Sequence, residues 1–390
     1  MFGLKLLGKL LEEERPEVDA RRCVRKFRRA SCDICAKYCP TQAIRLAGAI
    51  GEPPLRLDES SCAGCGICSN ICPTGAFVSP TANRLASSSG ANGAGFFCLR
   101  ADNGPRKGIK VPCLGILSEG ILVAAVGRHH ALSLDVSHCH ECELKGALSV
   151  VERTVARANA ILGALGSAKT IVLAYNARQQ RVPEQQSRRE FLNHLRGQAL
   201  KVAAESVGDV LGETLSWSQL AQSSADKIPI KHAFLQHHVE ALLASSRRDL
   251  RRGCIPFGVP LPPDGCEFCG ICAMACPSGA LRIQETDDEW ELCLEAWRCL
   301  DCRACADTCP TNGLRYSDSR EALRMVAGQQ TVLVHADKIT CASCGRRFAD
   351  GNGEDRCPSC EKRSSIDDLF VADQPKRSPA LSTANHGKEQ

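Results

Sequence analysis

The feature of this chain that most constrains its fold is the spacing of its 26 cysteines among 390 residues. All but Cys254 and Cys293 stand in groups with short, regular gaps. Secreted disulfide scaffolds are usually small and follow a signal peptide, whereas the N-terminal apolar stretch here is short and broken by lysines. No stretch approaches the roughly 20 apolar residues of a membrane span. We therefore expect a cytoplasmic protein without a transmembrane segment, in which metals hold the thiolates.

A fourfold repeat accounts for much of this pattern. In each copy a cysteine is followed by proline, then by serine or threonine, and two residues later by alanine or glycine. The copies begin at Cys39, Cys72, Cys276 and Cys309. The first two copies have the same separation as the last two. Two similar double units are therefore predicted toward the two ends of the chain, over residues 21–85 and 254–325.

Three of the copies close a run of the form C-x2-C-x2-C-x3-C-P. The runs are Cys62/Cys65/Cys68/Cys72, Cys266/Cys269/Cys272/Cys276 and Cys299/Cys302/Cys305/Cys309. This pattern resembles the bacterial ferredoxins that carry two [4Fe–4S] clusters. The spacing suits such clusters, because three nearby cysteines can wrap one face of a cubane while the fourth lies beyond reach. The proline then redirects the chain.

The resemblance implies that the fourth cysteine of each run binds the cluster of the other run. One C-terminal cluster would take Cys266, Cys269, Cys272 and Cys309, and the other would take Cys299, Cys302, Cys305 and Cys276. In the N-terminal unit, one cluster would take Cys62, Cys65, Cys68 and Cys39. Because such units have small cores, cluster binding is expected to contribute to their folding.

The remaining N-terminal site departs from the pattern, because eight residues separate its first two cysteines. We assign Cys23, Cys32, Cys35 and Cys72 to a fourth [4Fe–4S] cluster. In the alternative, Cys23 is not a ligand, and the site holds a [3Fe–4S] cluster or takes a fourth ligand from outside. The basic insertion at 21–29 is either a docking patch for an acidic partner or a solvated loop.

Residues 92–176 alternate short apolar segments with helical patterns. Strands are predicted at 94–99, 108–113, 131–136 and 170–175, and helices at 114–126 and 144–165. This alternation favours a small α/β domain with a mostly parallel sheet. Several cysteines stand at strand ends. Parallel strands bring such ends to one edge of a sheet, where loops can hold a cofactor.

The middle segment contains a second kind of cysteine set, made of Cys98, Cys113, Cys139 and Cys142. It resembles the iron–sulfur D subunit of methyl-viologen-reducing hydrogenases, through a Val-Pro-Cys-x-Gly turn that opens a helix and a strand that leads to paired cysteines. The resemblance implies a [2Fe–2S] cluster and a link between hydrogenase and heterodisulfide reductase. A zinc site and redox-silent thiols stay open as alternatives, and His138 or His140 could replace a cysteine ligand.

Near the C-terminus, two short cysteine pairs resemble a zinc ribbon over 330–365. The pairs are Cys341/Cys344 and Cys357/Cys360, a set that suits one tetrahedral Zn2+. A rubredoxin-type iron site uses the same pairs, usually with a longer separation.

The other segments carry less chemistry. An amphipathic helix is predicted over 1–20, a linker and helical region over 177–253, and a disordered polar tail over 373–390. His232, His237 and His238 are expected on helix surfaces, and Cys254 and Cys293 are expected to be packing residues. The predicted fold class is thus a multidomain α+β and α/β protein, in which two ferredoxin-like domains flank the α/β domain and the helical linker.

The formal charge of +5 counts every cysteine as neutral. With four [4Fe–4S] clusters, one [2Fe–2S] cluster and one Zn2+ bound to thiolates, the charge becomes about −7, and no nucleic-acid partner is expected. The sequence shows no phosphate-binding glycine loop and no evident nucleophile–base pair.

The leading interpretation is a non-catalytic, polyferredoxin-like electron-transfer subunit of an oxidoreductase, with hydrogenase or reductase subunits as partners. With the modules in series, electrons would enter one ferredoxin unit, cross the middle cluster and leave by the other. One alternative is a subunit of a heterodisulfide-reductase-like or hydrogenase-like complex with a catalytic middle cluster. Another is an iron–sulfur scaffold or maturation protein.

Overall fold

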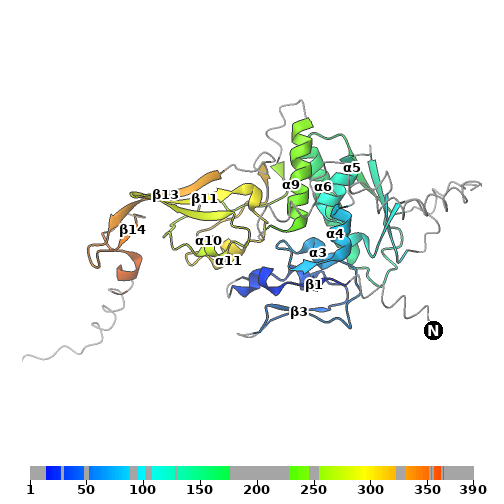
Figure 1. The fold of residues 1–390 in the computed structure, drawn as a ribbon, viewed down its shortest axis with the longest axis horizontal. Helices are drawn as coiled ribbons and strands as arrows, with labels where there is room; N and C mark the ends of the chain where they lie inside the picture. The colour runs from blue at the N-terminus through cyan, green and yellow to red at the C-terminus, as the bar shows by residue number, and fades with distance from the viewer. Residues whose placement is uncertain are drawn as a thin grey trace, which may run out of the picture.

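The structure is a computed structural model that contains several small sheets with helices packed between and around them (Figure 1). It describes residues 15–27, 30–47, 52–87, 95–101, 108–127, 131–175, 228–245, 254–321, 330–350, 353, 355–361 and 363. The predicted tail at 373–390 lies outside these residues. None of the helices within them is both long and apolar enough to cross a membrane.

The N-terminal unit is built from two antiparallel strand pairs and two short helices. β1 (Glu17–Val18) pairs with β4 (Phe77–Val78), and β2 (Ile44–Leu46) pairs with β3 (Leu55–Leu57). The helices are α2 (Ile34–Lys37) and α3 (Ile67–Ile71), and the 3-10 turns η1 (Ala20–Arg22) and η2 (Val24–Lys26) precede them.

The predicted N-terminal helix over 1–20 is wrong for the part that the structure describes. Residues 17 and 18 form strand β1, whose register is Glu17 opposite Val78 and Val18 opposite Phe77. The backbone amide of Asp19 also donates to the carbonyl of Ala76 at 2.9 Å. Pairing across the unit therefore overrides the helical pattern, and residues 1–14 lie outside the described part.

The α/β domain follows the predicted alternation of strands and helices. β5 (Gly95–Cys98) is parallel to β6 (Gly108–Val111), and β7 (Ala131–Asp135) is parallel to β8 (Thr170–Ala174). Between and around them lie α4 (Pro80–Ser87), η3 (Leu114–Ile116), α5 (Glu119–Gly127) and α6 (Ala147–Ala164). The strand hydrogen bonds form two separate parallel pairs, whereas one sheet was predicted.

Helix α9 (Ile230–Ser245) lies in the segment 177–253, for which a linker and helical region was predicted, and it adds a role in packing. Its side chains Phe234, Leu235 and Val239 are buried in the same core as α5 and α6, and the helix packs against α5, where Gly120 adjoins Phe234 and Leu235. Residues 230–245 are therefore part of the α/β core, because their apolar face has a partner there. Within 177–253, only 228–245 is described.

The same helix also contacts both ferredoxin-like units. The amine of Lys231 donates to the backbone carbonyl of Asn70 in the N-terminal unit. The Nε2 atom of His232 lies 2.7 Å from the carbonyl oxygen of Trp297 in the C-terminal unit. His232 is buried, so its predicted place on a helix surface is wrong. Helix α9 thus connects three parts of the molecule.

The C-terminal unit repeats the arrangement of the N-terminal one. β9 (Cys254–Ile255) pairs with β12 (Arg320–Glu321), and β10 (Leu281–Glu285) pairs with β11 (Glu289–Glu295). The helices α10 (Ile271–Ala275) and α11 (Ala304–Thr308) carry the cysteine runs, and η6 (Ala296–Arg298) precedes the second run.

The C-terminal sheet extends into the ribbon. β13 (Gln330–Thr340) pairs with β11 along its first part and with β14 (Arg347–Ala349) along its last part, in a sheet of order β10-β11-β13-β14. Figure 1 shows β13 running from the C-terminal unit out to β14. The predicted ribbon over 330–365 is therefore not a separate body, because its first strand completes the sheet of the C-terminal unit.

The side chain of Asn70 fastens the N-terminal unit to the α/β domain. Its Nδ2 atom donates to the carbonyls of Gly115 at 3.0 Å and Leu117 at 2.9 Å, and contacts Oγ1 of Thr154 at 3.2 Å. The residue is buried. Removing the amide would leave buried acceptors without a donor, which is costly.

We predict that Asn70→Ala lowers the stability of this interface by about 1 to 3 kcal/mol. The midpoint of anaerobic chemical unfolding, followed by loss of visible absorbance, should fall accordingly. Ser149→Ala is the control, because it removes an exposed hydrogen bond on α6 and leaves the interface intact. Equal midpoints for the two variants would contradict the assigned role of Asn70.

Candidate metal centres

Left-handed backbone positions shape the cysteine runs. The residue before the second cysteine has a positive φ in all three complete runs: Gly64 at 63°, Phe268 at 47° and Asp301 at 54°. The residue after it is also left-handed: Gly66 at 74°, Gly270 at 75° and Arg303 at 58°. Three of these six positions hold residues other than glycine, namely Phe268, Asp301 and Arg303. A left-handed backbone is costly for such residues, so the surrounding structure must maintain the tight loop there.

The four Cys-Pro repeats share a second piece of local geometry. We call the cysteine before each proline the crossing cysteine, because it is expected to bind the cluster of the other run. A hydroxyl oxygen two residues after it lies near its sulfur, at 3.7 Å for Cys39, 3.6 Å for Cys72, 3.7 Å for Cys276 and 3.4 Å for Cys309. Backbone amides also donate to two of these sulfurs, from Ala76 to Cys72 at 3.3 Å and from Ala280 to Cys276 at 3.1 Å. Such donors stabilise a thiolate.

The N-terminal thiols influence one another in two groups. Burial raises the pKa of Cys23, Cys32 and Cys35, to about 12 for Cys35, and a negative charge on Cys72 raises each further. Burial likewise raises the pKa of Cys65 and Cys68, with contributions from Cys39 and Cys62. The structure thus brings Cys72 close to Cys23, Cys32 and Cys35, and brings Cys39 close to Cys65 and Cys68.

The C-terminal thiols show the same crossing. Burial raises the pKa of Cys266 and of Cys272, to about 12 for Cys272, and Cys309 adds to both shifts. Burial also raises the pKa of Cys302 and Cys305, and Cys276 adds to both. The two units therefore place their crossing cysteines in the same way.

These thiol sets fit iron–sulfur clusters. All the cysteines whose side chains the structure describes are free thiols. A buried thiol with a raised pKa stays protonated unless a cation replaces the lost solvation of its thiolate. Metal ligation supplies that charge, and it couples binding to deprotonation.

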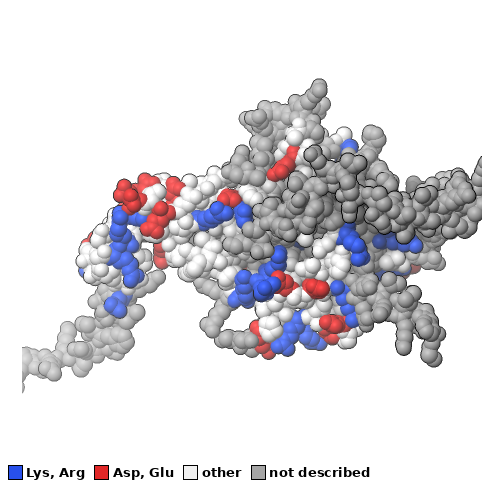
Figure 2. Space-filling model, viewed as in Figure 1, with Lys and Arg blue, Asp and Glu red and all other residues white. Residues whose placement is uncertain are grey.

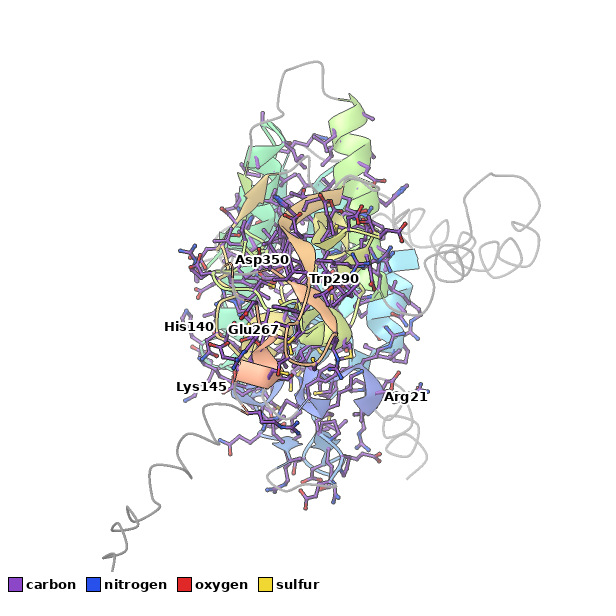
Figure 3. All side chains as sticks on the ribbon, turned by 90° about the vertical axis from the view of Figure 1, so that its left-hand side faces the viewer. Arg21, His140, Lys145, Glu267, Trp290 and Asp350 are labelled. Carbon is purple, nitrogen blue, oxygen red and sulfur yellow. The ribbon has the colours of Figure 1, made fainter. Side chains whose placement is uncertain are left out.

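Cys23 belongs to the N-terminal set whose spacing differs from the regular cysteine run. It is buried, and the insertion after it folds as turn η2, with Val24 also buried. The guanidinium of Arg25 donates to the carbonyls of Cys32 at 3.3 Å and Ala47 at 3.4 Å. Arg21 of the same basic segment lies at the outer surface of the unit (Figure 3) and pairs with Asp19 at 2.9 Å. The insertion is thus partly packed against the site and partly exposed.

The α/β domain brings its cysteines to one edge. Cys98 ends β5, Cys113 follows β6, and Cys139 and Cys142 follow β7. Interaction with the Cys113 thiol lowers the pKa of Cys98 to about 6, and the same interaction raises the pKa of Cys113. Burial raises the pKa of Cys139 to about 11, with contributions from Cys98 and Cys142.

Backbone amides in η3 and in the turn before α6 donate to two of these sulfurs. Gly115 donates to Cys113 and Leu144 donates to Cys142, both at 3.4 Å. His140 is exposed and lies at the edge of the molecule (Figure 3), with its ring 6.2 Å from that of Tyr175. His138 is partly exposed.

The ribbon cysteines form a more compact group. The sulfurs of Cys341, Cys344, Cys357 and Cys360 lie within 4.8 Å of one another, and this is the single compact ligand group found among the described residues. Such spacing suits a tetrahedral ion with metal–sulfur bonds of about 2.3 Å. The amide of Cys357 donates to Cys341 at 3.2 Å and lowers its pKa to about 6. A single ion such as zinc therefore fits here, whereas the wider ferredoxin sets suit clusters.

Sequence reasoning missed Tyr316 and Lys231. The hydroxyl of Tyr316 lies 3.3 Å from the sulfur of Cys299, and the guanidinium of Arg303 lies 5.2 Å from its ring centre. Lys231 is partly buried, and burial lowers the pKa of its amine, while nearby charges on Cys72 and Cys68 oppose this effect. No local pattern marks either residue. Tyr316 follows the cysteine run that ends at Cys309 and reaches Cys299 only through the fold, and Lys231 comes from the distant helix α9.

Comparison with known families agrees with this geometry. A family described as the 4Fe-4S dicluster domain matches residues 28–76 and 265–313. The two units are ferredoxin-like domains. The first match begins after Cys23, in keeping with the expanded gap there, and the second spans both of its cysteine runs. No curated protein matches the chain.

We predict that Tyr316→Phe lowers the midpoint potential of the cluster bound by Cys299. One hydrogen bond to a ligand sulfur favours the reduced, more negative state, and its loss corresponds to about 20 to 60 mV. Redox titration followed by electron paramagnetic resonance would measure the shift. Tyr175→Phe is the control, because that hydroxyl donates to Glu152 at the surface. A shift of the same size in the control would argue against the assignment.

We also predict that Cys344→Ser lowers the zinc content by about one ion per chain and leaves the iron content unchanged. Metal analysis of purified protein measures both. The control is Cys293→Ser, which alters a buried cysteine on β11 outside the ligand sets. Loss of iron from Cys344→Ser would show that the ribbon belongs to an iron site.

Proposed function

We propose that this protein is an iron–sulfur electron carrier of the polyferredoxin type, which relays single electrons between redox proteins. The observation that carries the proposal is the pairing of crossed thiol sets in two dicluster domains, since each domain buries the ligands of two clusters in one core. A reduced cluster differs from an oxidised one by a single electron, so such pairs suit one-electron exchange.

The proposed ligands are those of the crossed pattern. The N-terminal clusters use Cys23, Cys32, Cys35 and Cys72, and Cys39, Cys62, Cys65 and Cys68. The C-terminal clusters use Cys266, Cys269, Cys272 and Cys309, and Cys276, Cys299, Cys302 and Cys305. The burial of Cys23 beside Cys32 and Cys35 supports a four-cysteine site there over a three-cysteine one.

The α/β domain is proposed to hold a [2Fe–2S] cluster on Cys98, Cys113, Cys139 and Cys142. Two backbone amides that donate to these sulfurs support a site for thiolates. Its resemblance to a hydrogenase-associated subunit favours hydrogenase or reductase subunits as partners. One Zn2+ in the ribbon would fix the end of β13 to β14.

The surface also suits protein partners. Figure 2 shows patches of both signs, with acidic side chains gathered near the β11–β13 sheet and basic ones over the N-terminal unit and the ribbon. The acidic group includes the exposed turn at 285–289. Charged patches of either sign can steer redox proteins into transient complexes.

Metal and sulfide analysis of anaerobically purified protein tests the proposal. Four [4Fe–4S] clusters, one [2Fe–2S] cluster and one Zn2+ correspond to about 18 iron atoms, 18 sulfides and one zinc ion per chain. Redox titration should then show reversible one-electron reduction. Iron near 16 with extra zinc would remove the α/β domain from electron transfer. Clusters that are lost on reduction would instead favour a scaffold or maturation role.

A further inference from the structure

Four small apolar clusters connect the five proposed ligand sets. The first joins the α/β domain to the N-terminal unit: Cys113 and Cys142 pack in one cluster with Cys65, around Ile67 and Leu144. The guanidinium of Arg100 closes this junction by donating to the carbonyl of Ala63 at 3.0 Å. The α/β set thus adjoins the set that contains Cys65.

The second cluster lies inside the N-terminal unit. Cys68, from the set next to the α/β domain, packs in one core with Cys23, Cys35 and Cys72 of the other set. The fourth cluster is its equivalent in the C-terminal unit, where Cys299 and Cys305 share a core with Cys309 and Cys272. Within each unit, the two sets are therefore neighbours.

The third cluster joins the two units directly. Cys32 of the N-terminal unit and Cys302 of the C-terminal unit both pack against Val24, Ala30 and Ala304. Beside them, the amide and hydroxyl of Ser31 donate to the carboxylate of Asp307 at 2.8 and 2.9 Å. One ligand from each unit thus meets at a contact made of small side chains.

The α/β domain also touches the C-terminal unit, but far from its own cysteines. That contact includes the ion pair of Arg157 with Asp301 at 3.7 Å. On α6, Arg157 lies ten residues beyond Ala147, which packs at the first junction, so about 15 Å of helix separates the two points. Electron tunnelling slows steeply with distance, and the stepwise path through the N-terminal unit is favoured.

We propose that the five ligand sets form one line, in which the α/β set is an end and the two ferredoxin-like units exchange electrons directly through Cys32 and Cys302. The other end is the set that contains Cys269, whose side chain is exposed. This order replaces the sequence-based expectation that electrons cross the α/β cluster between the units. It rests on the proposed function. Each transfer moves one electron from a donor protein at one end to an acceptor at the other, without breaking a bond.

Magnetic relaxation in the fully loaded chain tests this order. After reduction with dithionite, a fast-relaxing [4Fe–4S] neighbour shortens the relaxation of a [2Fe–2S] signal, in a way that power saturation measures. Cys65→Ser alters the adjacent set, so the [2Fe–2S] signal should saturate at several-fold lower power. Cys302→Ser alters a set two steps further along, so saturation should stay as in the wild type. An equal or larger effect of Cys302→Ser would overturn the order.

A second measurement keeps every ligand in place. Ala304→Leu inserts a larger side chain into the contact between the units, and Asp307→Asn weakens its polar edge. Both should reduce the magnetic interaction between the units while iron content and the [2Fe–2S] signal remain at wild-type values. Lys338→Met, on the distant strand β13, is the control. An unchanged interaction in Ala304→Leu would overturn the direct junction.

The two proposals fail in different ways. Wild-type protein with four reducible [4Fe–4S] clusters but no [2Fe–2S] signal would overturn the five-set line, while the electron-carrier function would stand. Protein without reducible clusters would overturn the function itself.

Discussion

The bond between buried thiolates and metal is the interaction on which the rest of the structure depends. Burial, together with the charges of neighbouring thiols, raises the pKa of Cys35 and of Cys272 to about 12, so these thiols stay neutral unless a cation binds them. The surrounding apolar clusters are small, and several consist largely of cysteines themselves. Cluster binding is therefore expected to be coupled to folding, as in other small metal-binding domains.

The crossing of ligands has a further structural consequence. In the proposed ligand pattern each cluster takes thiols from both runs of a unit, so neither half would hold its cluster alone. Between units the contacts are of a different kind: small apolar side chains around Ala304, and the hydrogen bonds of Ser31 with Asp307. Helix α9 adds a third element, because it packs in the α/β core and contacts both units through Lys231 and His232.

Much of the fold and site could be predicted from local pattern. The strands that end at Cys98 and precede Cys113 were predicted because apolar alternation and a nearby proline are properties of the segment itself. The N-terminal helix failed at residues 17 and 18, since their strand depends on a partner about sixty residues away in the chain. The helical pattern of α9 was likewise predicted, but its packing was not, because the core residues that it contacts are distant in sequence.

By itself, the sequence determined which cysteines stand in the two ferredoxin-like units, and with them the [4Fe–4S] chemistry of those units. Such spacing is decisive because ligand geometry is local and strict. Only the tertiary structure decided which of the proposed ligand sets adjoin, with Cys32 packed near Cys302 and Cys65 packed near Cys113 and Cys142. It also decided that Tyr316 reaches Cys299 and that β13 completes a ferredoxin sheet. These contacts join segments that are far apart in the chain, and packing, which no local pattern encodes, selects them.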